Sequence, residues 1–233
     1  MADLFLVRHG QASFGAADYD RLSTLGEDQS RRLGRWFARC GLVPDLVAHG
    51  PQRRQSGTAR LCLAETLAPT SVPMLELSGL GEFDHEEVIA RHRPDLADKD
   101  ALKAFLAACD HPRRLYQTMY AEAVARWTGG ENDADYRESW PAFRARVHGA
   151  LTELTGSPAQ CVVAFTSGGP ITAVLQGLVG LPDARAFTLN WPLVNTGMTR
   201  LRFSARTGAL TLATYNAQPH LDEARDPALV TYR

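Results

Sequence analysis

The chain has 233 residues with 25 basic and 26 acidic side chains, and 45% of its residues are hydrophobic. This composition is typical of a globular protein of one large domain or two small ones, and it excludes a disordered tail protein. With no basic excess, we expect no nucleic-acid partner, and any site for an anion has to be local.

The start of the chain and its cysteines predict a cytoplasmic location without a membrane partner. Asp3 precedes a short apolar run that Arg8 ends, unlike the basic start and long apolar core of a signal peptide. No apolar stretch approaches the roughly 18 residues that a membrane span needs. The cysteines form no C-x-x-C pair, which favours buried free thiols in a reducing compartment over a metal site. They are Cys40, Cys62, Cys109 and Cys161.

The first eighty residues predict strands and helices in alternation. An apolar run at residues 4–7 stops at Arg8-His9-Gly10, the pattern of a buried strand that ends in a functional loop. Apolar positions at helical spacing follow from Thr24, and Gly41 suits the end of that helix. The next elements are expected at residues 45–48 (strand), 51–67 (a helix opened by Gly50-Pro51) and 74–77 (strand).

Residues 84–140 are polar and helical in period, and we interpret them as a helical cap inserted over one face of the sheet. Beyond them we expect a helix at 140–154, an apolar strand at 161–165, a helix ending near Gly180, and a hairpin of strands 198–203 and 209–215. The run at 161–165 is typical of a central parallel strand. This alternation predicts a three-layer α/β/α sandwich with a mostly parallel sheet, with residues 1–233 as a single domain.

Polar residues and glycines cluster where the strands are expected to end, which is where open α/β sheets bind ligands. Arg8 and His9 follow the first strand, Arg54 opens the helix after the second, and Gly168-Gly169 follow the central one. Two guanidiniums, a helix N-terminus and a glycine-rich turn match the oxygens of a dianionic phosphoryl group. The other residues at these ends are Gly10, His49, Gly50, Glu82 and Ser167.

His9 is expected to lie between Arg8 and Arg54, and its pKa should be lowered because both guanidiniums would repel a protonated ring. The imidazole would then be neutral and nucleophilic. The alternative is a core or surface histidine without a role, beside an ordinary solvated arginine. Arg-His-Gly at a strand end, combined with an arginine at a helix start, favours the functional interpretation.

Five blocks of residues stand in one order between residue 4 and about residue 175. They are Leu4 to Gln11; Leu22-Ser23 with Gly26, Gln29 and Leu33-Gly34; Pro51, Arg54, Thr58 and Ala59; Leu80 with Glu82; and Ser167 to Ile171. Together they resemble the histidine phosphatase superfamily, the phosphoglycerate-mutase-like proteins. The combination is far more specific than any single block.

The resemblance implies a role for each matched residue. His9 would attack phosphorus and become phosphohistidine, while Arg8 and Arg54 hold the phosphoryl oxygens. Glu82 would protonate the leaving oxygen and later assist water; its alternative is a solvated loop carboxylate. The resemblance also implies a small phosphorylated substrate, no metal and no other cofactor. We expect hydrolysis rather than mutase transfer, because nothing readable specifies a cap that retains the intermediate.

One departure from the family pattern is Ser167, where family members carry a histidine before Gly-Gly. A hydroxyl donates one hydrogen bond but supplies no cationic charge, and losing one such stabiliser costs about 10²–10³ in rate. We therefore expect weak or altered turnover. His49, or else His85, could supply the missing imidazole; the alternative for His49 is a histidine that caps a strand end. The family's loop asparagine is also absent near Phe14-Gly15.

Two other functions remain open on the sequence. A phosphate-binding or regulatory module of the same fold would keep Arg8, His9 and Arg54 and would tolerate Ser167. A more distant alternative is a serine hydrolase with Ser167 as nucleophile, although Phe165 stands where that motif needs glycine. Its triad partners would be His220 with Asp183 or Asp222.

Three aromatic residues of the expected cap have two interpretations. Tyr116, Tyr120 and Trp127 either line an entrance for an apolar or aromatic leaving group or belong to the core. Aromatic residues at helical spacing more often belong to the core.

Overall fold

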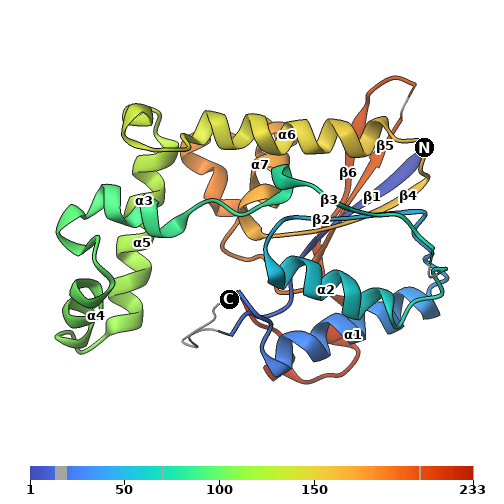
Figure 1. Ribbon diagram of the computed structural model, residues 1–233, viewed down its shortest axis with the longest axis horizontal. Helices are drawn as coiled ribbons and strands as arrows, with labels where there is room; N and C mark the ends of the chain where they lie inside the picture. The colour runs from blue at the N-terminus through green and yellow to red at the C-terminus, as the bar shows by residue number, and fades with distance from the viewer. Residues whose placement is uncertain (14–19, 70, 205, 233) are drawn as a thin grey trace.

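The computed structural model describes residues 1–13, 20–69, 71–204 and 206–232. This part of the chain forms a six-stranded sheet with helices on both faces, the three-layer α/β/α sandwich that the sequence predicts (Figure 1). The strands are β1 (Ala2–Arg8), β2 (Leu46–His49), β3 (Met74–Glu76), β4 (Cys161–Thr166), β5 (Met198–Phe203) and β6 (Leu210–Ala217). Their order is β3-β2-β4-β1-β5-β6; the first four run parallel, and β5 and β6 form the predicted antiparallel hairpin.

The apolar strand β4 lies in the middle of the sheet, as predicted. Val163 pairs with Phe5 of β1 on one side and with Val47 of β2 on the other. Because successive side chains of a strand point to opposite faces, Val162 belongs to one hydrophobic core and Val163 to another. Burial on both faces explains why this strand is apolar without interruption.

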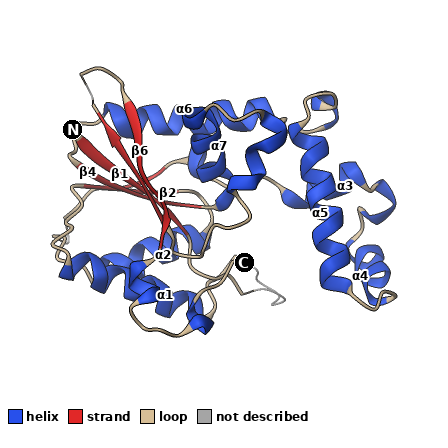
Figure 2. Ribbon diagram, turned by 180° about the vertical axis from the view of Figure 1, so that it is seen from behind, coloured by secondary structure: helices blue, strands red, loops and turns tan. Residues whose placement is uncertain are grey.

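Two pairs of helices cover the two faces of the sheet (Figures 1 and 2). One pair is α1 (Thr24–Arg39) and α2 (Arg53–Leu63), and the other is α6 (Trp140–Gly156) and α7 (Gly168–Val179). The Ser23 side chain caps α1 by accepting a hydrogen bond from the Gly26 N–H. Gly41 and Gly180 follow α1 and α7 with left-handed φ angles of 64° and 68°, the backbone for which glycine is preferred.

Helix α2 is shorter than the sequence predicts. It begins at Arg53 rather than at Pro51, because Gln52 is the N-cap and forms a capping box with Gln55. It ends at Leu63, although the chain beyond it has no strong breaker before Pro69. The shift leaves Arg54 in the first turn, where it was expected.

The insertion predicted for residues 84–140 contains α3 (His85–His92), α4 (Lys99–Ala107) and α5 (Pro112–Thr128). The sequence placed it over one face of the sheet, whereas Figures 1 and 2 show these helices beside the sheet. Trp127 of α5 is fully buried and stacks on Phe83, with ring centroids 4.6 Å apart. It also meets Trp140 of α6 at 5.1 Å. This aromatic cluster holds α5 against the start of α6 and explains the position.

The remaining short helices lie mainly in connections. They are α8 (Pro219–Asp222) and the 3₁₀ turns Ser78–Leu80, Pro94–Leu96, Asp133–Asp135, Asp183–Leu189 and Pro227–Leu229. None of the described helices combines the length and the apolar character needed to cross a bilayer. The four cysteines are free thiols, but only Cys62 is buried; burial raises the pKa of its thiol.

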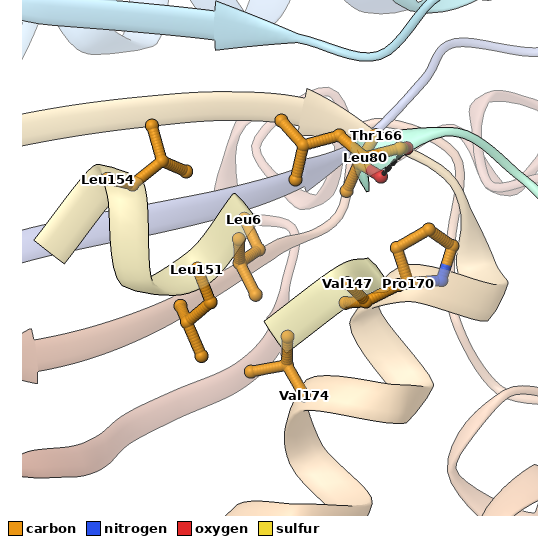
Figure 3. Close-up of a pocket in the computed structure, with 8 residues that line it drawn as sticks. All are labelled: Leu6, Leu80, Val147, Leu151, Leu154, Thr166, Pro170 and Val174. Atoms are coloured by element: carbon orange, nitrogen blue, oxygen red, sulfur yellow. Dashed lines mark hydrogen bonds between the residues drawn. The ribbon is translucent and has the colours of Figure 1, made fainter. Parts of the chain in front are cut away.

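A small apolar gap lies between the sheet and helices α6 and α7 (Figure 3). Its volume is about 10 Å³, barely the space of one water molecule. The Thr166 hydroxyl at its wall donates a hydrogen bond to the Leu80 carbonyl at 2.6 Å, so this polar group is already satisfied. The gap is therefore a packing defect and offers nothing to a ligand.

Candidate active site

A cavity of about 660 Å³ opens at the carboxyl ends of the strands, within the size range of small-molecule sites. Arg8, His9, Arg54, Glu82 and Gly168 line it. These residues come from β1, α2, the loop after β3 and the start of α7. Five of the residues that the sequence singled out for phosphoryl chemistry therefore meet at one cavity.

The backbone around His9 is held from two sides. Its N–H donates to the Thr166 carbonyl of β4 at 2.8 Å, and its carbonyl accepts from Asn195 Nδ2 at 3.0 Å. Its ring is held as well: Nδ1 lies 2.7 Å from the Gly10 carbonyl oxygen, and Nε2 lies 3.1 Å from Arg54 Nε. Because a carbonyl only accepts, Nδ1 carries the hydrogen and Nε2 presents its lone pair.

The pKa of His9 lies well below its usual value. Burial of the ring is the largest cause, and the charges of Arg54 and Arg8 lower the pKa further. The sequence predicted the direction from the two arginines alone, and the structure adds the greater effect of desolvation. The ring is neutral at pH 7.

Both arginines are fixed by acceptors outside the cavity. Arg8 Nη1 donates to the Leu193 carbonyl at 2.5 Å. Arg54 Nη1 donates to Asp20 Oδ1 at 2.7 Å, and Asp20 Oδ2 accepts from the Arg53 backbone N–H at 2.8 Å. Sequence reasoning missed Asp20, since a single aspartate before the first helix carries no pattern that would have revealed it.

The Glu82 carboxylate lies at the N-terminus of α7. Its two oxygens accept hydrogen bonds from the Gly169 N–H at 3.1 and 3.2 Å, the position where a helix favours negative charge. A Cβ at Gly169 would lie 2.1 Å from Glu82 Oε1, so only glycine admits the carboxylate. The structure thus brings Glu82 into the cavity wall.

The Ser167 side chain does not line the cavity. It is fully buried, and its hydroxyl accepts from Gln55 Nε2 at 2.8 Å. The His49 ring also lies outside the lining, with Nδ1 2.8 Å from the Gly50 carbonyl oxygen. His85, at the start of α3, does line the cavity. Ser167 and His49 are thus absent from the residues that line the cavity, and their part in phosphate binding stays a prediction.

The partners imagined for a serine hydrolase are not assembled around Ser167. His220 Nε2 lies 2.8 Å from Thr196 Oγ1, and Asp183 Oδ1 accepts from Trp140 Nε1 at 2.9 Å. Asp222 accepts from Gln218 Nε2, also at 2.9 Å. Each candidate thus has a partner elsewhere in the fold.

Two further features of the site bear on the sequence predictions. Phe14-Gly15, where the family asparagine was sought, lies outside the described residues. Within the described ranges, no three His, Cys, Asp or Glu side chains are grouped to hold a metal ion.

The loop after His9 packs directly against the start of α1. A Cβ at Gly10 would lie 2.4 Å from the Gly26 carbonyl oxygen, and one at Gly26 would lie 2.1 Å from the Gln11 carbonyl oxygen. Gln29 Oε1 then accepts the Gln11 N–H at 2.9 Å. These contacts join Gly26 and Gln29 to the loop that follows Arg8-His9-Gly10.

The sequence model of the histidine phosphatase superfamily (branch 1) matches residues 4–128 and 111–216. The matched stretches run from β1 into β6 and include nearly all of the chain. The chain belongs to the histidine phosphatase superfamily. The resemblance seen in the five sequence blocks is thereby confirmed.

Relatives of this histidine phosphatase superfamily protein differ in function. The 2,3-bisphosphoglycerate-dependent phosphoglycerate mutase of Thermobifida fusca (strain YX) is 38% identical over 72 residues; the match spans 28% of this chain and only 29% of the mutase. The α-ribazole phosphatase of Shigella flexneri has a TM-score of 0.61 at 20% identity, over 93% of this chain and 96% of that one. An Entamoeba histolytica phosphoserine phosphatase mutant with phosphoserine gives 0.55 at 18%, over 95% and 100%. These two solved structures have the same fold as this chain.

Proposed function

We propose that this protein hydrolyses small phosphomonoesters through a phosphohistidine at His9. The observation that carries the proposal is a neutral imidazole in the cavity wall whose Nε2 carries no hydrogen and accepts a hydrogen bond from Arg54, with Arg8 next to it in the chain. Hydrolases and a mutase among the relatives make phosphoryl chemistry the natural use of such a site.

In the first step, His9 Nε2 forms a bond to phosphorus as the bond to the leaving oxygen breaks. The Gly10 carbonyl keeps the hydrogen on Nδ1 and stabilises the cationic ring that results. Arg8 and Arg54 donate hydrogen bonds to the phosphoryl oxygens. To do so, Arg54 Nε turns from His9 to the substrate. Glu82 gives the leaving oxygen its proton.

In the second step, water attacks phosphorus and the P–N bond breaks. Glu82, now a carboxylate, takes one proton from the water, so that inorganic phosphate leaves and His9 is neutral again. The Gly169 N–H holds the Glu82 carboxylate in the cavity wall, where it can reach the leaving oxygen and the attacking water. The proton taken from water in this step replaces the one given in the first.

Ser167 favours a second candidate, a phosphate-binding module with little turnover. The Ser167 hydroxyl is hydrogen-bonded to Gln55 and supplies no charge to the transition state. If His85 in the wall does not replace the family imidazole, the rate falls by about 10²–10³. The two candidates differ in rate and not in the ligand they bind.

The test is hydrolysis of 4-nitrophenyl phosphate by the wild-type chain, His9→Ala and the control His111→Gln, which changes an exposed imidazole at the start of α5. We expect His9→Ala to lose about 10³-fold or more of kcat/KM, because the nucleophile is gone. His111→Gln should match the wild type. Acid-labile phosphate on His9 should be trapped by rapid quenching.

Equal release of phosphate by wild-type and His9→Ala chains would overturn the phosphatase proposal. Tight binding of inorganic phosphate together with that equality would leave the binding module as the function.

A further inference from the structure

The cavity also has aromatic lining residues, and we call the part of its wall that α5 and Trp191 form the far wall. Phe83, Tyr116, Tyr120, Trp191 and Tyr232 line the cavity together with the charged residues. They come from the loop before α3, from α5, from the segment after α7 and from the C-terminal segment. Of the three cap aromatics that the sequence singled out, two line the cavity, whereas Trp127 belongs to the core.

Three of these rings, Tyr116, Tyr120 and Trp191, are in contact with one another in sequence. Tyr116 and Tyr120, one turn apart on α5, stack with an interplanar angle of 7° and centroids 6.2 Å apart. Trp191 meets Tyr120 edge-on at 5.7 Å. Trp191 keeps 45% and Tyr232 53% of its surface exposed. Large aromatic side chains left open beside a cavity are suited to a flat apolar ligand.

The lining residues that α5 and Trp191 contribute carry no positive charge within the described part of the chain. Arg8 and Arg54 lie beside His9, and His85 is the first residue of α3. The polar lining residue of this wall is the neutral amide Gln117 of α5. Asn190 lies against the start of α7 instead, where its Nδ2 would be 2.8 Å from a Cβ at Gly168. A carboxylate on the leaving group would lose hydration there without gaining a cationic partner. The wall therefore disfavours phosphorylated hydroxy acids.

We propose that the substrates are phosphomonoesters of uncharged alcohols that carry an aromatic ring. This inference rests on the proposed function and names the class of ester. The phosphoryl group binds at His9, and the ring packs against the surface that Tyr120 and Trp191 form together. A cavity of about 660 Å³ holds such an ester with the ring well inside it.

The test compares 2-phenylethyl phosphate with propyl phosphate and phosphoserine. All three are esters of primary alcohols, so their leaving oxygens are similar in chemistry. Differences in kcat/KM between them therefore reflect contacts of the alcohol group with the far wall. We expect kcat/KM for the phenylethyl ester to exceed that for the propyl ester by about tenfold. Phosphoserine should be hydrolysed more slowly than propyl phosphate.

Single substitutions test which side chains cause the preference for the phenylethyl ester. Tyr120→Ala and Trp191→Ala should each lower the phenylethyl-to-propyl ratio about three- to tenfold, and Tyr120→Phe should keep it. The control Trp36→Ala removes an aromatic ring on α1 that packs on Phe37 and does not line the cavity. Because propyl phosphate is the internal reference, a partly unfolded variant does not change the ratio.

Calorimetry measures the affinity of the His9→Ala chain for the phenylethyl and propyl esters. This measurement separates the inference from the proposed function. A preference for the phenylethyl ester in binding, without turnover in the wild type, supports the inference and overturns the phosphatase. Turnover that depends on His9 but favours phosphoserine, or treats the phenylethyl and propyl esters alike, overturns the inference alone. Equal affinities for these two esters overturn it as well.

Discussion

At the scale of single residues, His9 is prepared for nucleophilic attack by neighbours with separate effects. The Gly10 carbonyl sets the tautomer, while Arg54 approaches the lone pair of Nε2. Burial lowers the pKa of the ring more than either arginine does. Asn195 holds the His9 carbonyl, although nothing in its sequence context indicates this role.

Asp20 positions Arg54, and we expect Asp20→Asn to lower kcat/KM for phosphate esters by about tenfold. The amide keeps the shape but loses the charge that fixes the guanidinium. The control is Asp28→Asn, which removes a surface carboxylate paired with Arg32 at 2.7 Å. The measurement is kcat/KM of both variants by steady-state kinetics. An unchanged kcat/KM in Asp20→Asn, or an equal loss of kcat/KM in Asp28→Asn, would contradict the positioning of Arg54 by Asp20.

At the scale of elements, the site depends on how closely the loop after β1 approaches α1. Gly26 has no space for a methyl group because backbone atoms of Gln11 occupy it. Such a contact is not relieved by a side-chain rotation, so the loop and the helix have to separate. The start of α1 therefore acts on the geometry of His9 through the loop.

We expect Gly26→Ala to lower the free energy of unfolding by about 1–3 kcal/mol, the usual cost of overpacking, and to reduce activity as well. The control is Gly149→Ala, at an exposed position within α6 where a Cβ would have no neighbour within 4 Å. That change should raise the free energy of unfolding by about 0.5–1 kcal/mol. Urea denaturation measures both; a neutral Gly26→Ala would show that the loop is not tightly packed.

At the scale of the whole molecule, the sheet separates two cores, and the larger continues into the insertion through Phe83 and Trp127. His220 lies in neither cluster, yet it is fully buried beside Thr196. Burial, with a smaller effect of Arg32, lowers the pKa of His220 to about 3. This histidine makes the stability of the fold depend on pH.

Below about pH 6.5 the unfolded chain takes up a proton at His220, whereas the folded chain does so only near pH 3. The free energy of unfolding therefore falls as the pH drops through this window, by at most about 1.4 kcal/mol per unit for this group. His9, whose pKa is also lowered, acts in the same direction.

We expect His220→Gln to reduce the loss of stability between pH 7 and pH 5 by about 1–2 kcal/mol, relative to the wild type. Urea denaturation at the two pH values measures it, with exposed His111→Gln as the control. If the free energy of unfolding depends on pH identically in His220→Gln and the wild type, His220 does not contribute to that dependence.

Sequence patterns predicted the sheet well because their causes are local. A strand buried on both faces has to be apolar, as at residues 161–165, and a left-handed helix end favours glycine, as at Gly41 and Gly180. The position of the insertion was not predictable in this way. It depends on Trp127 meeting Phe83 and Trp140, and the period of a helix does not say which partner its aromatic face will find.

The chain's own order of residues was enough to indicate the α/β architecture, the family, and a histidine beside arginines at a strand end. Only the tertiary structure decided that Asp20 holds Arg54, that Ser167 is hydrogen-bonded to Gln55, and that aromatic rings line the cavity. The reason is physical: backbone conformation follows from neighbours a few residues away, whereas these contacts join residues about 34 and 112 positions apart. Such side chains meet only when all the layers are in place.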